Sequence, residues 1–132
     1  DAVAGHVPLF MTNVVIVSQH IRAGTLRALG VTTRGETRHV PNTPSFAQQG
    51  FGDFEAPTWW AMLGRTGTPQ PILDRMHAAL TQVVREPEVK ARIEDQGCDI
   101  QATSPEEARR FIAAEIERWG AVIRQNDIRA DS

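Results

Sequence analysis

Residues 54–73 constrain the fold most strongly, because the sequence pattern there changes within a few positions. The first part, residues 54–60, contains Phe54, Trp59 and Trp60 and favours a half-buried strand. A Gly/Thr/Pro cluster follows. Within it, the Thr68 hydroxyl can cap a helix, and Pro69 suits the first helical position because it has no N–H to leave unpaired. A strand, a tight turn and a capped helix in this order are half of a βαβ unit.

Apolar residues at spacings of three and four predict most of the remaining helices. Ser104 and Glu107 form a capping box, which starts a helix that runs to about Asn126. A middle helix follows Pro69, and Pro87 interrupts it and begins a shorter one ending near Gly97. Further helices are predicted over 14–23 and 44–49. The apolar stripes of the middle and last helices are expected to be buried.

Two more strands are predicted, at Val7 to Met11 and Leu26 to Thr32. Strands and helices then alternate, and no hairpin turn joins two strands. That order predicts an α/β domain with a mainly parallel sheet flanked by helices. A length of 132 residues is enough for one domain with its own core.

Composition provides no sign of nucleic acid, metal or cofactor binding. The net charge of −2 and pI near 6.1 give no basic footprint for nucleic acid or an anionic membrane. The four histidines lack metal-ligand spacing, and Cys98 has no second cysteine to pair with. Residues 64–68 lack the lysine of a phosphate-binding loop, and no Gly-x-Ser-x-Gly motif occurs. We therefore expect no metal, no cofactor and no catalytic residues.

Four segments resemble one known family in order and spacing. They are His-Ile-Arg-Ala-Gly-Thr-Leu-Arg-Ala-Leu-Gly-Val-Thr at 20–32, Val-Pro-Asn-Thr-Pro at 40–44, residues 54–71, and Ile-Glu-Arg-Trp-Gly at 116–120. The chain resembles the C-terminal part of a tripartite tricarboxylate transporter receptor, the TctC-like or Bug family of extracytoplasmic solute-binding proteins. Members of this family continue well upstream of the position of Asp1.

This resemblance implies a two-lobed fold of the type II periplasmic-binding-protein kind, with a long C-terminal helix. Residues 1–32 would be a remnant of the second lobe, 33–103 mostly a first-lobe segment, and 104–132 the C-terminal helix and tail. It also implies a periplasmic receptor without enzymatic activity. Such a receptor captures a small carboxylate and delivers it to the membrane permease subunits of its transporter.

Thr12, Asn13 and Trp59 are the candidate ligand-binding residues. Thr12 and Asn13 follow the predicted strand 7–11, and ligands of open α/β sheets gather beyond the carboxyl ends of strands. Trp59 could form a wall of the cleft. The alternatives are an Asx-type turn at Asn13 and a core position for Trp59. Where the family commonly has Phe-Asp-Asn, this chain has Met11-Thr12-Asn13, so a hydroxyl replaces an acidic group.

Two other functions stay open at this point. An α/β enzyme domain would need a histidine and a carboxylate within hydrogen-bond reach in a cleft. A helical interaction module would need the stripe from Phe111 to Ile123 to be exposed. Because the part of the family that carries most of the first lobe lies upstream of Asp1, we also expect weak carboxylate binding and self-association of this chain.

Overall fold

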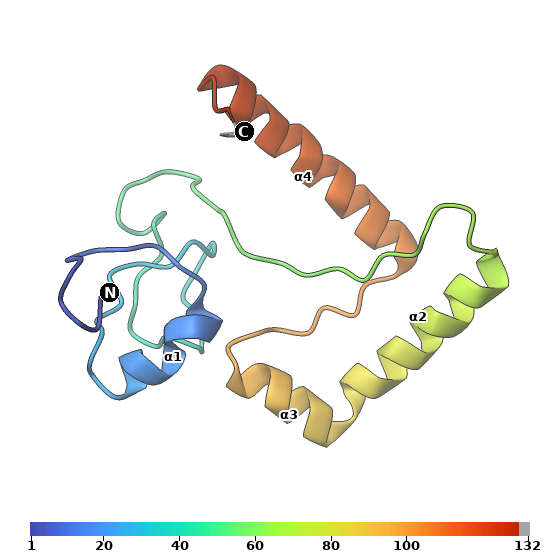
Figure 1. Ribbon diagram of the computed structural model, residues 1–132, viewed down its shortest axis with the longest axis horizontal. Coiled ribbons are helices and arrows are strands. Elements are labelled where there is room, and N and C mark those ends of the chain that lie inside the picture. Colours follow the sequence, from blue (N-terminus) through green and yellow to red (C-terminus); the bar gives the residue numbers. More distant parts are fainter. Residues whose placement is uncertain (130–132) are drawn as a thin grey trace. The chain divides into compact units, whose positions relative to one another are not determined.

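Residues 1–129 are described in the computed structural model, and they form two compact units. Unit 1 consists of Asp1–Trp60 and Arg85–Ile100, and unit 2 consists of Ala61–Val84 and the chain from Gln101 onward. The described residues contain four α-helices (Figure 1). These are α1 (Val14–Arg22), α2 (Gln70–Arg85), α3 (Pro87–Asp95) and α4 (Pro105–Gln125). Helices α1 and α3 lie in unit 1, and α4 and nearly all of α2 lie in unit 2.

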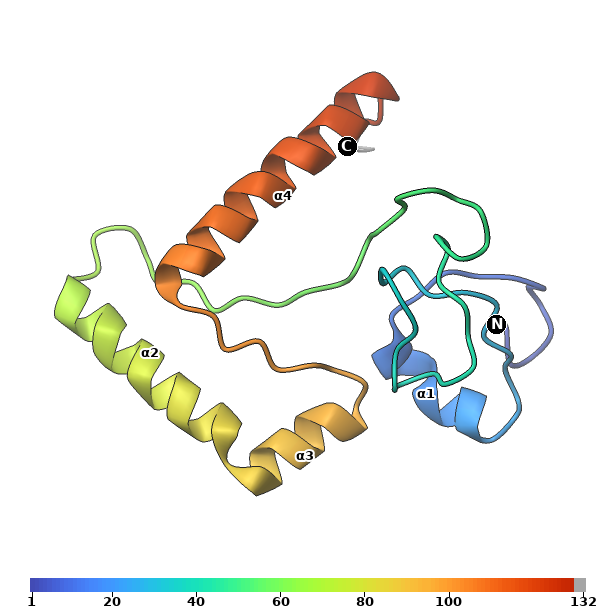
Figure 2. The same ribbon diagram turned by 180° about the vertical axis from the view of Figure 1, so that it is seen from behind.

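The expected α/β fold with a mainly parallel sheet is wrong. Within residues 1–129 the only β pairing is one isolated parallel bridge between Val31 and Ser45, and the ribbon shows no strand in either view (Figures 1 and 2). The segments 7–11 and 26–32 contain strand-forming residues, but no neighbouring strand in this part of the chain pairs with them. Strand preference mostly reflects packing against neighbours, so without such neighbours Leu9 and Leu29 remain exposed.

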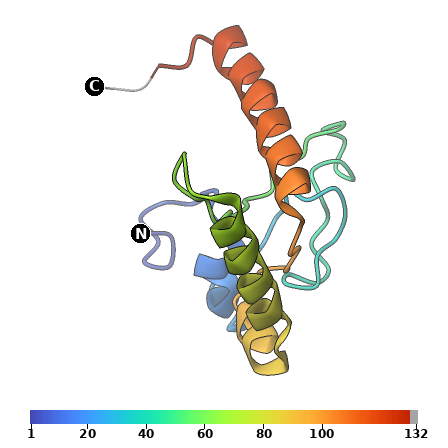
Figure 3. The same ribbon diagram turned by 90° about the vertical axis from the view of Figure 1, so that its right-hand side faces the viewer.

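The helix predictions for 14–23, the middle segment and the last segment are confirmed by α1, α2 and α4. Side-chain caps at Asn13 and Ser104 mark the starts of α1 and α4. Ser104 accepts a hydrogen bond from the Glu107 N–H at 3.2 Å, and Glu107 accepts one from the Ser104 N–H at 2.8 Å. Pro87 begins α3 after the break, as expected. The single unbroken course of α4 is clear in Figure 3.

Two local predictions are wrong. The Thr68 hydroxyl donates to the Arg65 carbonyl at 2.8 Å, α2 begins only at Gln70, and no hydrogen bond among the described residues makes Thr68 its cap. Instead, the Pro69 carbonyl accepts the N–H groups of Ile72 and Leu73. The short helix predicted over 44–49 is a turn, in which Ser45 and Gln48 each bond the other's backbone N–H.

Unit 1 is held together around the turn that follows Ser45. The Val31 N–H donates to the Pro44 carbonyl at 3.1 Å, and the Phe46 N–H donates to the Val31 carbonyl at 3.0 Å. The Gln49 side chain packs against Gly30, where a Cβ atom would lie 2.7 Å from the Gln49 side-chain nitrogen. The buried residues of unit 1 are Ser18, Val40, Thr43 and Ser45. Three of these four are polar, so unit 1 has a small and largely hydrogen-bonded interior.

Unit 2 has two amphipathic helices that approach each other near their N-terminal ends and diverge from there (Figures 1 and 2). Its one buried residue among those described is charged: Glu115, at 9% exposure. The expectation that the helical stripes are buried is wrong here. The exposed apolar side chains are Ile72, Met76, Leu80 and Val83 of α2 and Phe111, Ile116, Trp119 and Ile123 of α4.

Candidate functional site

Thr12 and Asn13 lie directly before α1, in unit 1. The Asn13 side-chain oxygen accepts a hydrogen bond from the Val15 N–H at 3.1 Å and so caps the helix. The first turn of α1 contains no acidic residue, so no carboxylate from that turn competes for the positive end of the helix dipole. This capping is the Asx-type role that the sequence left open. It engages only the oxygen of the Asn13 amide, while the NH₂ group remains a donor.

Gly97 lies against the start of α1. A Cβ atom at Gly97 would lie 3.1 Å from Val14 Cγ1 and 3.7 Å from the Val15 nitrogen. Its φ of 91° is also in the left-handed region that favours glycine. The chain after α3 therefore contacts the first turn of α1, next to Asn13.

Trp59 comes from a separate part of unit 1. Its segment is attached through Ala56, whose N–H donates to the Thr32 carbonyl at 3.0 Å and whose carbonyl accepts the Thr32 hydroxyl at 2.9 Å. Trp59 is 40% exposed, so it does not occupy a core position. Thr12 and Asn13 are adjacent in the sequence, at the start of α1. The role of Trp59 beside them stays a prediction.

A charged cluster in unit 1 was not anticipated from the sequence. It consists of Arg38, His39, Glu94 and Asp99, and we call it the Arg38 cluster. The Arg38 guanidinium donates to Glu94 at 2.9 Å and to Asp99 at 2.5 Å. These contacts tie the loop 33–42 to the C-terminal end of α3 and to the chain just after it. The contacting residues are 56 and 61 positions apart, and no local spacing rule could have paired them.

The electrostatics of this cluster favour an ionised Asp99. Partial burial alone would raise the pKa of Asp99, but the Arg38 hydrogen bond and the His39 imidazole outweigh that effect and lower it below its ordinary value. Asp99 is therefore an anion at neutral pH.

The same pair bears on the enzyme alternative. His39 Nε2 lies 3.3 Å from Asp99 Oδ1, within ion-pair range, but the geometry of the contact does not make a hydrogen bond in the described residues. The His39 side chain is only 7% exposed, so a substrate cannot reach its ring. Asp99 is shared with Arg38. The pair therefore fixes the loop and does not form an acid–base site.

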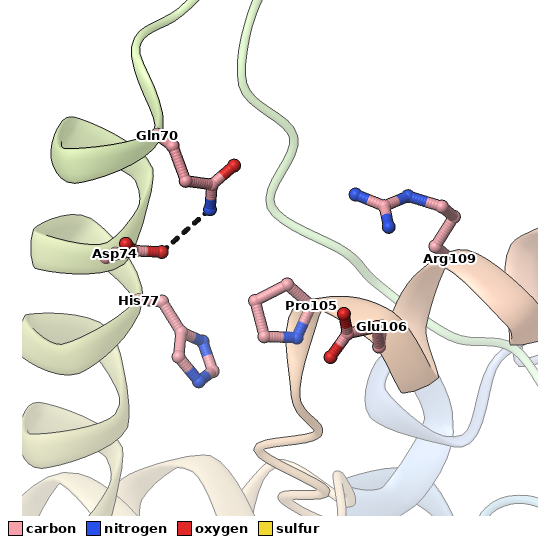
Figure 4. A pocket seen from close by; sticks show the side chains of 6 residues that line it. All are labelled: Gln70, Asp74, His77, Pro105, Glu106 and Arg109. Atoms are coloured by element: carbon pink, nitrogen blue, oxygen red, sulfur yellow. Dashed lines mark hydrogen bonds between the residues drawn. The ribbon is translucent and has the colours of Figure 1, made fainter.

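Unit 2 contains an open polar crevice of about 360 Å³ between the first turns of α2 and α4 (Figure 4). It is lined by Gln70, Asp74, His77, Pro105, Glu106 and Arg109. Gln70 donates to Asp74 at 2.7 Å within α2, as the dashed line shows. Both charge signs are present and most of the lining is exposed, so the crevice selects no particular ligand charge.

Two searches of residues 1–129 concern other kinds of site. No group of three or more His, Cys, Asp or Glu side chains in this part of the chain could hold a metal ion. None of its helices combines the length and the apolar character needed to cross a bilayer.

Comparison with known proteins finds one family that matches nearly the whole chain. The sequence pattern described as the tripartite tricarboxylate transporter family receptor matches residues 1–128. The chain is 31% identical over 125 residues to Protein BugT of Bordetella pertussis, an alignment that covers 95% of this chain and 38% of BugT. It is also 31% identical over 124 residues to a UPF0065 protein from the tcbD-tcbE intergenic region of Pseudomonas sp. strain P51, covering 93% of this chain and 37% of that protein.

A third relative is a UPF0065 protein from the clcB-clcD intergenic region of Pseudomonas knackmussii. It is 27% identical over 124 residues, and the alignment covers 93% of this chain and 73% of that protein. The chain thus spans less than two fifths of the length of the first two relatives and about three quarters of the third.

Proposed function

The chain belongs to the family of tripartite tricarboxylate transporter receptors, and we propose that this protein is a periplasmic solute-binding receptor that captures a small carboxylate for such a transporter. The observation that carries the proposal is the family match, because it extends over residues 1–128 and is not confined to one motif. The similarity to BugT runs over the same length and supports it.

Thr12 and Asn13, at the start of α1, would be this chain's contribution to the solute site. A carboxylate needs donors, and the free NH₂ group of Asn13 and the hydroxyl of Thr12 can supply them beside the positive end of α1. The exposed ring of Trp59 would cover an apolar part of the solute.

Thr12 would also influence which carboxylate binds. A hydroxyl has no charge to offer an ammonium group, whereas the acidic residue common at this position in the family has one. We therefore propose that the solute is a carboxylate without an amino group, such as a dicarboxylate, in preference to an amino acid. The loaded receptor would then dock on the permease subunits of its transporter.

The first test is titration calorimetry of the 132-residue chain with succinate, malate, citrate, glutamate and nicotinate. A few donors on an open surface leave the carboxylate mostly solvated, so we expect dissociation constants of about 1 mM or weaker, equivalent to no more than about 4 kcal/mol. Micromolar binding by this chain alone would show that our assignment of the site is wrong.

The second test uses the product of the complete gene. We expect saturable binding of one carboxylate, and a loss of about 10-fold or more in affinity for Thr12→Val, because a hydrogen bond to a charged group is removed. Thr33→Val is the matched control, since the Thr33 hydroxyl bonds the Gly35 carbonyl in an exposed loop. Absence of saturable binding to every carboxylate would contradict the proposed function.

A further inference from the structure

We propose that the turn after α3, residues 97–99, positions the Asn13 amide of the proposed solute site, with Gly97 as its point of contact and His39 as its support. This inference rests on the proposed function, because it concerns the same site. It adds positioning residues that act on the solute only through Asn13. All of them lie in unit 1.

Gly97 lies directly against the hydrogen bond that holds Asn13. A Cβ atom at Gly97 would lie 3.7 Å from the Val15 nitrogen, whose N–H donates to the Asn13 side-chain oxygen at 3.1 Å. The same Cβ atom would lie 3.1 Å from Val14 Cγ1, so Val14 would have to move by a few tenths of an ångström. The oxygen and the NH₂ group of Asn13 belong to one planar amide, so the cap also sets the direction of the NH₂ donor.

The backbone of Gly97 is itself held in place. The Gly97 N–H donates to the Glu94 carbonyl at 2.9 Å, and the Cys98 N–H donates to the Ile93 carbonyl at 3.4 Å. These two bonds close the C-terminal end of α3 around a residue with a φ of 91°, a conformation that glycine adopts at little cost. The turn therefore has little freedom to move away from α1.

His39 contacts the same turn. Its Cβ atom would lie 3.9 Å from a Cβ atom at Gly97, and its Nε2 lies 3.3 Å from Asp99 Oδ1. The His39 side chain is only 7% exposed, and Nε2 has no hydrogen-bond partner among the described residues. Leaving a buried nitrogen without a hydrogen bond costs free energy, so stability alone does not explain why His39 lies beside Asp99.

The charged residues around this contact tie the turn to the loop that carries His39. Arg38 donates to Asp99 at 2.5 Å and to Glu94 at 2.9 Å, and Lys90 lies 3.9 Å from Glu94. The first turn of α1 adds no acidic residue. The Asp99 carboxylate is thus held by two cationic or imidazole groups of one loop. Movement of this loop therefore moves the turn, and with it the cap of α1.

The variants Gly97→Ala and Gly24→Ala, made in the product of the complete gene, test the proposal. Both glycines have a positive φ, but nothing lies within 4 Å of a Cβ atom at Gly24, which follows the other end of α1. Titration calorimetry uses succinate, malate, citrate, glutamate and nicotinate, at a temperature where both variants are folded. We expect Gly97→Ala to weaken carboxylate binding by about 5-fold or more and Gly24→Ala by less than about 2-fold. Equal affinities of the two variants would overturn the inference.

A second pair of variants tests the role of His39. In His39→Gln the side-chain nitrogen can take the place of Nε2, whereas His39→Met has a similar length and no donor. We expect His39→Gln to keep the affinity within about 2-fold and His39→Met to lose about 3-fold or more. A loss of stability alone would not separate these affinities, because both are measured on folded protein. Equal affinities of the two variants would overturn the role of His39.

Hydrogen exchange of the Val15 N–H, measured without solute, separates this inference from the proposed function. We expect exchange about 5-fold faster or more in Gly97→Ala than in Gly24→Ala. Faster exchange together with no carboxylate binding by the unaltered protein would overturn the proposed function, and with it the role of the turn in binding. Equal exchange in the two variants, in a protein that does bind a carboxylate, would overturn this inference alone.

Discussion

Unit 1 and unit 2 differ in the contacts that stabilise them. Unit 1 buries Val40 together with three hydroxyl-bearing residues and closes its loops with backbone and charged hydrogen bonds. Unit 2 has the longer helices, yet the residue it buries in the described chain is Glu115, and its large apolar side chains remain exposed.

This contrast teaches that regular secondary structure and tertiary completeness are separate properties. A capping box defines the start of α4, and α2 forms without a cap from Thr68. Helices in water nevertheless owe most of their stability to packing of an apolar face. Unit 1 has less helix and more long-range contacts. We therefore expect mutations in unit 1 to act through its interior, and mutations in unit 2 to act through helix ends and partners.

The largest effect is expected for Val40→Asp. Val40 is 2% exposed, so the change places an unpaired charge in the interior of unit 1 and should lower the free energy of unfolding by about 3–5 kcal/mol. The same change at the exposed Val3 is the control. Urea denaturation measures the free energy of unfolding of both variants. Similar losses at Val40 and Val3 would show that the interior of unit 1 does not contribute to its stability.

A smaller effect is expected for Gly97→Ala. The new Cβ atom meets Val14 at 3.1 Å and the residue keeps a positive φ, so we expect a loss of about 2 kcal/mol. Gly24→Ala also has a positive φ but meets nothing within 4 Å, and should cost only about 1 kcal/mol. Thermal unfolding separates the two. A larger loss at Gly24 would mean that the contact with α1 does not matter.

In unit 2, Ser104→Ala should cost about 1 kcal/mol, because it removes one half of the capping box of α4. Thr103→Ala, at the exposed neighbouring position, should change almost nothing. Helical circular dichroism during unfolding is the measurement. If both variants behave alike, α4 is held by contacts other than its cap.

The smallest effect is the acid sensitivity of the Arg38 cluster. The pKa of Asp99 is lowered by folding, so its contribution is present above the ordinary value of 3.8 and is lost as pH falls through the lower folded value. The Asp99 side chain is 53% exposed, so solvent screening limits the contribution to a few tenths of a kcal/mol, roughly. Asp99→Asn should reduce the fall of the melting temperature with decreasing pH below about pH 4. Asp53→Asn should leave that pH dependence unchanged.

The sequence predicted what depends on neighbouring residues along the chain. Ser104, Pro105 and Glu107 fix the start of α4 by themselves, and Pro87 alone forces the break between α2 and α3. The sheet could not be judged this way, because strand-forming residues at 7–11 and 26–32 become strands only when other strands lie beside them.

The same division between local contacts and contacts of residues far apart in the sequence holds for burial and for the candidate site. The stripe of α4 was identified correctly, but whether Trp119 is buried depends on what packs against it, and Trp119 is 41% exposed. Asn13 was identified from its place after a predicted strand and serves as the cap of α1. The Arg38 cluster joins residues far apart in the sequence and had no local signal.

Hydrogen exchange measured residue by residue tests the contrast between the units most directly. The account predicts slow exchange of the N–H groups of Val31 and Phe46 in unit 1, and faster exchange of the α4 amides in unit 2, because the apolar side chains of α4 are exposed. Exchange of the α4 amides as slow as that of Val31 and Phe46 would contradict it, since α4 would then be as firmly packed as the interior of unit 1.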